Sequence, residues 1–165
     1  MSTIQEQGRR VLLSTVSSDA HTWNLVFLQL FLEEQGYEVV NLGPCVPDEL
    51  LLSTARRHQP DAIAISSVNG HGYLDGERLI RALRADPQLA RIPTVIGGKL
   101  GLAGGDDDRT RALIEAGFDA VFTDSGDPLA LHAYLRGLPT NAPAPSMGDR
   151  NLNLDRDLAL SGSVR

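Results

Sequence analysis

The sequence predicts a single α/β domain with a five-stranded parallel sheet and helices on both faces of the sheet. Five short apolar runs alternate along the chain with five longer amphipathic segments. The apolar runs are continuous rather than alternating in polarity, which is typical of parallel strands covered on both faces. Right-handed crossovers between such units predict the flavodoxin-like doubly wound arrangement.

The first half of the chain predicts two strand–helix pairs. Residues 11–16 are mostly apolar and are followed by a mostly apolar helical segment at residues 23–35. Gly36 then stands where a helix C-terminus favours a left-handed backbone. A strand at residues 38–42 precedes a helix at residues 48–58, whose first two residues are acidic and favour the positive end of the helix dipole.

The second half repeats the same pattern three times. Each apolar run is short and is followed by a segment with helical periodicity, and Gly117 marks the end of one of these segments. We expect strands at residues 62–66, 94–96 and 120–122, and helices at residues 76–85, 109–116 and 128–136.

Composition sets further expectations. We expect residues 1–138 to form the domain and residues 139–165, which are rich in proline and small polar residues, to form a linker and tail that is either disordered or docks on a partner. A net charge of −6 argues against an extended nucleic-acid surface. A single cysteine excludes an intrachain disulfide, and no apolar run approaches the ~20 residues of a membrane span. With no visible signal peptide, a cytoplasmic location is expected.

Small and polar residues follow four of the predicted strands. They include Ser17 to His21, Ser66 to Gly70, Gly97 to Lys99, and Ser125 with Gly126. Ligands of doubly wound sheets bind beyond the carboxyl ends of the strands. The sequence therefore predicts a binding site formed by these four loops.

Asp19 and His21 are the residues with the clearest chemistry in these loops. A metal-ligating imidazole usually donates its other ring N–H to a carboxylate, which fixes the tautomer. One imidazole and one carboxylate are too few to hold a free ion, so the pair suits a metal already held by a macrocycle. The alternative is that Asp19 caps the following helix and His21 is a surface residue. His71 is a weaker candidate for ligand contact, and His132 is expected at the surface.

Other nucleotide or phosphate functions have little support. The chain has no G-x-x-x-x-G-K-[ST] sequence, and no G-x-G-x-x-G follows the first strand. A phosphorelay receiver would need an aspartate at the end of the third strand, where this chain has Ser66 and Ser67.

Three short stretches, in order, resemble the cobalamin-binding domain family, whose pattern is D-x-H-x-x-G, then S-x-L, then G-G. They are Asp19-Ala20-His21-Thr22-Trp23-Asn24, Ser66-Ser67-Val68 and Gly97-Gly98. Within that family the chain resembles the small subunits of glutamate mutase, also called methylaspartate mutase, over residues 10–138. Asn24 replaces the glycine of the pattern and Val68 replaces its leucine.

The resemblance implies roles for individual residues. His21 would be the lower axial ligand of cobalt, Asp19 would hydrogen-bond its other nitrogen, Ser66 would contact the buried nucleotide tail, and Gly97 and Gly98 would line the tail channel. None of the residues would be catalytic. The expected cofactor contacts are Ser17, Ser18, Asp19, Ala20, His21, Thr22, Asn24, Ser66, Ser67, Val68, Gly70, Gly97, Gly98, Lys99, Ser125 and Gly126.

The resemblance also implies an activity and a partner. The chain would carry adenosylcobalamin in a carbon-skeleton mutase, and a large barrel-type subunit would bind the substrate, so the chain would be inactive alone. A corrinoid carrier for methyl transfer is less favoured, because such carriers usually have a helical bundle before this domain and only ten residues precede the first predicted strand. A non-enzymatic cobalamin-binding regulator and a homologue that has lost the cofactor are further alternatives.

Overall fold

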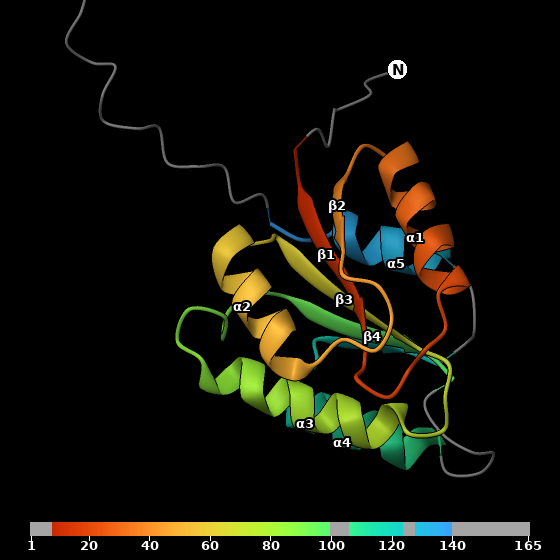
Figure 1. The fold of residues 1–165 in the computed structure, drawn as a ribbon, viewed down its shortest axis with the longest axis vertical. Coiled ribbons are helices and arrows are strands. Elements are labelled where there is room, and N and C mark those ends of the chain that lie inside the picture. The colour runs from red at the N-terminus through yellow and green to blue at the C-terminus, as the bar shows by residue number, and fades with distance from the viewer. Residues whose placement is uncertain (1–7, 100–105, 124–127, 140–165) are drawn as a thin grey trace, which may run out of the picture.

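The computed structural model describes residues 8–99, 106–123 and 128–139 (Figure 1). The strands are β1 (Arg10–Thr15), β2 (Glu38–Asn41), β3 (Ala62–Ser67), β4 (Thr94–Gly98) and β5 (Ala120–Phe122). The helices are α1 (Trp23–Glu34), α2 (Asp48–His58), α3 (Gly72–Ala85), α4 (Asp106–Ala116) and α5 (Pro128–Arg136).

All five strands form one parallel sheet in the order β2-β1-β3-β4-β5. This is the flavodoxin-like order, so the predicted fold class is confirmed. Helices α1 and α5 cover one face of the sheet, and α2, α3 and α4 cover the other (Figure 1). The order reverses between β1 and β3, which places the chain's topological switch point at these two strands.

The core follows the two-residue period of the strands. Leu12 and Ile63 point into the layer under α2, α3 and α4, whereas their neighbours Leu13 and Ala64 point into the layer under α1 and α5. Burial of each large apolar side chain contributes about 1.5–3 kcal/mol to folding. Both faces of the central strands are therefore committed to the core, as the continuous apolar runs predict.

The structure extends two of the predicted elements near the site. β4 continues through Gly97 and Gly98, which pair with Ser66 and Ser67 of β3, so both glycines lie in a strand and not in the predicted loop. α3 begins at Gly72, four residues before the predicted start. The backbone N–H of His71 donates to Asn69 Oδ1 at 3.1 Å and closes the turn before α3. The helix can therefore begin directly after this turn.

His132 was predicted at the surface, and the structure shows it only partly exposed. Its Nδ1 atom is buried and has no hydrogen-bond partner among the described residues. The ring packs edge-on against Phe31 at 6.1 Å and Tyr37 at 5.9 Å between ring centres. His132 is therefore part of the packing between α1 and α5.

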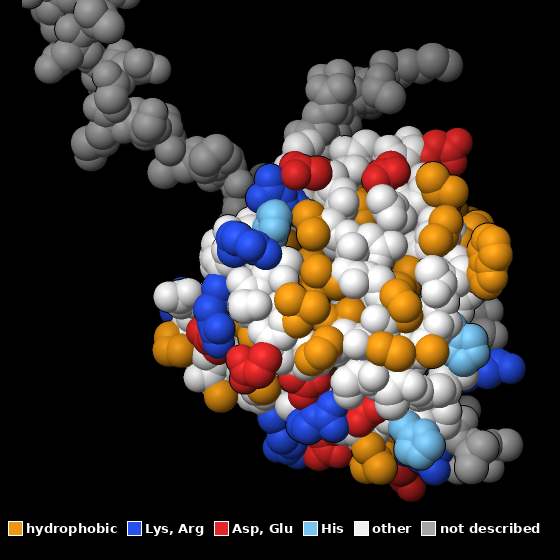
Figure 2. Space-filling view, in the orientation of Figure 1, with side chains coloured by type: hydrophobic (Ala, Val, Ile, Leu, Met, Phe, Trp, Pro, Cys, Tyr) orange, Lys and Arg blue, Asp and Glu red, His pale blue; other side chains and the backbone are white. Residues whose placement is uncertain are grey.

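Helix α1 exposes an apolar stripe along one side. Trp23, Val26, Phe27 and Leu30 recur at the spacing that places them on one side of the helix, and Trp23 is 85% exposed. Orange hydrophobic side chains lie over α1 in Figure 2, while charged side chains are interspersed over α2 and α3. Within the described residues, no helix is long and apolar enough to cross a membrane.

Arg9 joins the two ends of the described domain. Its guanidinium donates to the carbonyl of Leu135 at 2.6 Å and to that of Leu138 at 3.0 Å. The contact fixes the end of α5 beside the start of β1, at the amino-terminal edge of the sheet.

Candidate functional site

The candidate site lies at the carboxyl edge of the sheet, at the switch point between β1 and β3. The loop after β1 carries Asp19 and His21, and the loop after β3 begins at Val68. The backbone N–H of Val68 donates to Asp19 Oδ2 at 2.7 Å, so the two loops are directly bonded. Because β1 and β3 are parallel, their carboxyl ends meet at the same edge of the sheet, and this brings together Asp19 and Val68, which are 49 residues apart in sequence.

Asp19 and His21 form a tight pair. Asp19 Oδ1 lies 2.7 Å from His21 Nδ1 and also accepts the backbone N–H of His21 at 2.9 Å. The Asp19 side chain is 1% exposed, whereas that of His21 is 62% exposed. An ionised carboxylate only accepts, so the Nδ1 atom carries the proton and the Nε2 lone pair is left available on the exposed side of the ring.

The hydrogen bonds to Asp19 determine its charge. Burial raises the pKa of the carboxyl, but the backbone N–H groups of His21 and Val68 and the imidazole together hold the pKa below its ordinary value. Asp19 is therefore a carboxylate at neutral pH. It does not cap α1, because Thr22 is the N-cap residue and no side chain caps that position.

The backbone of the His21 loop is also fixed. Cys45, in the loop before α2, donates its N–H to the carbonyl of Asp19 at 2.7 Å. Three loops therefore meet at Asp19, through one carbonyl and two carboxylate oxygens. Within the described residues, no cluster of three histidine, cysteine or acidic side chains could hold a metal ion.

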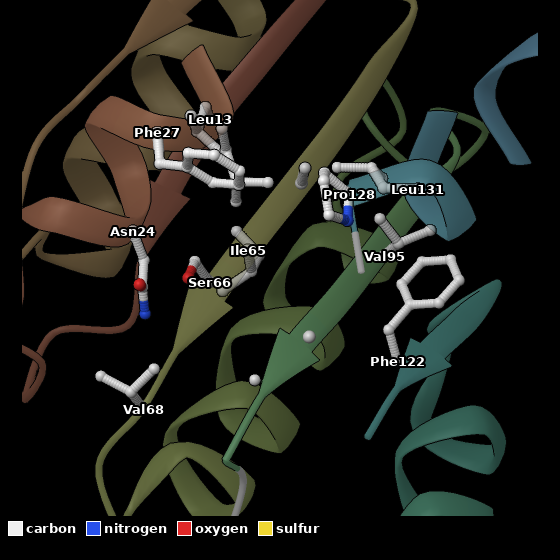
Figure 3. Close-up of a pocket in the computed structure, with 14 residues that line it drawn as sticks. Leu13, Asn24, Phe27, Ile65, Ser66, Val68, Val95, Phe122, Pro128 and Leu131 are labelled. Carbon is white, nitrogen blue, oxygen red and sulfur yellow. The ribbon is translucent and has the colours of Figure 1, made fainter. Parts of the chain in front are cut away.

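A pocket of about 190 Å³ opens beside the His21 loop, between the sheet and helices α1 and α5 (Figure 3). Asn24, Ser66 and Val68 lie toward one end of this pocket, and Phe122, Pro128 and Leu131 lie toward the other (Figure 3). Sequence reasoning found the first three and missed most of the apolar lining. The missed lining residues are Leu13, Phe27, Leu28, Ala64, Ile65, Val95, Phe122, Pro128 and Leu131.

Ser66 contributes a polar side chain to the pocket, and Gly97 and Gly98 form part of its floor. The side chain of Ser66, which is 8% exposed, forms no hydrogen bond with any described residue. Gly98 has a φ of +113°, and a Cβ there would lie 1.9 Å from the carbonyl oxygen of Ser67. Only glycine fits this position, which leaves the backbone of β4 bare along the pocket.

Ser17 and Ser18 lie away from the pocket, against α3. Ser18 Oγ donates to Asp75, and Arg78 donates to Ser17 Oγ at 2.9 Å. Arg78 also binds both Asp75 and Asp48, and these hydrogen bonds, chiefly that of Asp48, hold the pKa of the guanidinium above its ordinary value despite desolvation. We call Arg78, Asp48, Asp75, Ser17 and Ser18 the Arg78 network.

The remaining predicted residues are less tightly connected to the pocket. Ala20, Thr22, Gly70, His71 and Lys99 are exposed, and none of them lines the pocket. The side chain of Ser67 is directed to Asn69 at 3.5 Å and not to the pocket. Ser125 and Gly126 lie outside the described residues, as does the predicted tail from residue 140 onward.

Known proteins resemble this chain over the same region. The family model for the B12 binding domain matches residues 9–131. The chain is 35% identical to glutamate mutase sigma subunit 1 of Haloarcula marismortui over 121 residues, which is 73% of this chain and 79% of the relative. It is 27% identical to the glutamate mutase sigma subunit of Clostridium cochlearium over 124 residues, which is 74% of this chain and 89% of the relative.

Solved structures show the same fold in proteins of different function. A cobalamin-binding protein from Desulfitobacterium hafniense has a TM-score of 0.63 at 20% identity, covering 79% of this chain and 60% of that chain. The chemotaxis response regulator CheY4 of Vibrio cholerae has a TM-score of 0.59 at 17% identity, covering 80% of this chain and all of that one. These likenesses support the fold alone, whereas the family match and the sigma-subunit identities concern this sequence itself. The chain belongs to the B12-binding domain family and is related to the small subunits of glutamate mutase.

Proposed function

We propose that this chain is the cobalamin-carrying small subunit of a cytoplasmic, adenosylcobalamin-dependent carbon-skeleton mutase. His21 is the lower axial ligand of cobalt, and a larger barrel-type subunit binds the substrate. The observation that carries the proposal is the pairing of an exposed imidazole with a buried carboxylate, 2.7 Å apart, beside an open pocket. Glutamate mutase relatives are the reason for choosing a mutase over a methyl carrier.

The described residues fit a bound corrinoid. The His21 ring offers one nitrogen outward while its other nitrogen is held, which is the donor set expected for a metal carried by a macrocycle. The pocket offers an apolar wall, one free hydroxyl at Ser66, and a bare backbone floor at Gly98 for the nucleotide tail. When bound, adenosylcobalamin supplies radical chemistry through homolysis of its cobalt–carbon bond.

In this proposal the chain binds the cofactor and orients His21 toward cobalt. Asp19 holds the His21 proton on Nδ1, so that the Nε2 lone pair is left to bind cobalt. The pocket between the sheet and helices α1 and α5 holds the tail and keeps water from it. The substrate groups belong to the partner, so this chain alone is inactive.

A titration with cobalamin tests the axial ligand. The wild-type chain is expected to bind and to give a visible absorption spectrum showing loss of benzimidazole ligation and its replacement by imidazole. His21→Ala is expected to abolish that spectral change and to weaken binding about tenfold or more, because it removes a metal ligand and leaves only the tail contacts.

His71→Ala is the matched control. His71 is also exposed and lies near the same edge of the sheet, at the start of α3, but its ring has no carboxylate partner among the described residues. We expect it to behave as the wild type. An imidazole-ligated spectrum from His21→Ala would remove His21 from the proposal, and loss of that spectrum in His71→Ala would assign the ligand to His71 instead.

Asn24→Gly tests the departure from the family pattern. The Asn24 side chain extends into the pocket mouth between Ser66 and Val68 (Figure 3), where a bound tail would have to displace it. Removing it is expected to tighten cobalamin binding by about three- to tenfold, while the loss of helix propensity costs about 0.5 kcal/mol of folding stability. Weaker binding would instead mean that the Asn24 amide contacts the tail, and parallel titrations with urea unfolding separate the two effects.

A further inference from the structure

We propose that the Arg78 network positions the axial histidine, with Arg78 acting as a clamp that fixes the His21 loop on α2 and α3. The inference rests on the proposed function, since it assigns a role in cobalt ligation to residues that touch neither the pocket nor His21. Arg78 is a positioning residue in this scheme, and it acts through Ser17, Ser18 and Asp75.

The guanidinium of Arg78 holds three separate segments together. Its Nε donates to Asp48 Oδ2 at 2.7 Å at the start of α2, and its Nη1 donates to Asp75 Oδ1 at 2.8 Å on α3. Its Nη2 donates to Ser17 Oγ at 2.9 Å, at the start of the His21 loop. The planar fork of arginine supplies these directions at once, which the single ammonium group of lysine does not.

Asp75 completes the contact with the loop. One carboxylate oxygen accepts from Arg78, and the other accepts from Ser18 Oγ, next to Asp19. The amide of Asn69 donates to Ser18 Oγ at 3.0 Å, so the hydroxyl of Ser18 has both its donor and an acceptor role filled. The network is therefore continuous from α2, through Arg78 and Asp75, to the residue before Asp19.

This anchoring complements that of Asp19. Asp19 fixes the imidazole tautomer and accepts backbone N–H groups from Val68 and Cys45, but these contacts all meet at one residue, about which the loop could still rotate. Ser17 and Ser18 provide fixed points on the α3 side, where the Asp75 side chain is 14% exposed and that of Arg78 is 53% exposed. Metal–ligand distances fall within about 0.2 Å of their standard values, so a loop that rotates would place the ring nitrogen at a binding distance for less of the time.

The test compares three variants of the whole chain loaded with cobalamin. In Arg78→Met, the imidazole-ligated fraction, measured by visible absorption, is expected to fall about three- to tenfold while cobalamin still binds through its tail. Arg78→Lys is expected to restore part of that fraction, because the charge stays near both carboxylates. Arg81→Met is the matched control, since Arg81 forms an ion pair with Glu77 on the same helix and does not touch the loop.

Amide hydrogen exchange in the chain without cofactor gives a second measurement. The N–H groups of His21, Val68 and Cys45 report the loop directly, because all three donate to Asp19. We expect Arg78→Met to speed their exchange and Arg81→Met to leave it unchanged. A drop in the ligated fraction with faster exchange at these amides supports the inference.

Two results would overturn the inference, and they differ from failure of the proposed function. The clamp is wrong if Arg78→Met and Arg81→Met give the same ligated fraction. It is also wrong if Arg78→Met changes that fraction only by unfolding the chain, seen as faster exchange throughout the sheet. If the wild-type chain itself binds no cobalamin, the proposed function fails, and this is seen before any variant is compared.

Discussion

Gly98→Ala is expected to lower the free energy of unfolding by about 2–4 kcal/mol. A Cβ at residue 98 would lie 1.9 Å from the carbonyl oxygen and 2.9 Å from the carbonyl carbon of Ser67, and both are backbone atoms of the neighbouring strand. The φ of +113° is in addition a conformation that alanine rarely adopts. β4 can accept the methyl group only by separating from β3 at its carboxyl end, and this would also deform the pocket floor.

Gly97→Ala is the matched control for this variant. A Cβ at Gly97 would lie 3.3 Å from Phe122 Cβ, a contact that a shift of a few tenths of an ångström relieves, and its φ is not positive. We expect a cost below about 1 kcal/mol. Urea unfolding of both variants measures the difference, and equal costs would show that the end of β4 is not held in the described conformation.

Replacing Asp19 is expected to have the second largest effect. Asp19→Ala would leave the backbone N–H groups of Val68 and His21 without their acceptor and remove the partner of the imidazole. Unsatisfied buried donors cost about 1–3 kcal/mol each, so we expect a loss of about 2–4 kcal/mol of folding stability. Asp19→Asn keeps an acceptor and the side-chain volume, and its cost should be smaller.

The effect of Asp19 is expected to depend on pH. Its folded pKa lies below the unfolded value of about 3.9, so the carboxylate contributes stability at neutral pH that is lost as the pH falls through the folded pKa. The stability difference between wild type and Asp19→Asn should be constant above about pH 5 and should shrink below it. Thermal unfolding at a series of pH values measures this difference. A difference that stays constant down to about pH 2 would mean that Asp19 is not preferentially ionised in the folded chain.

Much of the fold follows from local pattern. The continuous apolar runs predicted the strands of a sheet covered on both faces, and Gly36 and Gly117 adopt the positive φ expected where a helix ends. The extension of β4 through Gly97 and Gly98 could not be predicted from local pattern, because paired glycines are typical of turns. Only the pairing with Ser66 and Ser67 shows that Gly97 and Gly98 continue the ladder.

The candidate site was also predictable in part from local sequence pattern. Asp19 and His21 are close in sequence, so their spacing allowed a hydrogen bond between them, but it equally allowed Asp19 to cap the following helix, and the family resemblance favoured the bond. The bond from Val68 to Asp19 and the contacts of Arg78 with Ser17 depend on how distant segments pack, and no local signal marks them. The missed pocket residues come from the strands, α1 and α5, where apolar residues look like ordinary core.

The hydrogen bonds between Arg9 and the end of α5 affect how the protein could be engineered. Because the carbonyls of Leu135 and Leu138 accept from Arg9, the two ends of the described domain lie side by side, at the edge of the sheet opposite the His21 loop. A short bridge could join them, and new ends could be opened in an exposed loop elsewhere, giving a circularly permuted protein. A tag or reporter domain attached directly before residue 8 or directly after residue 139 would likewise start on the side away from the pocket.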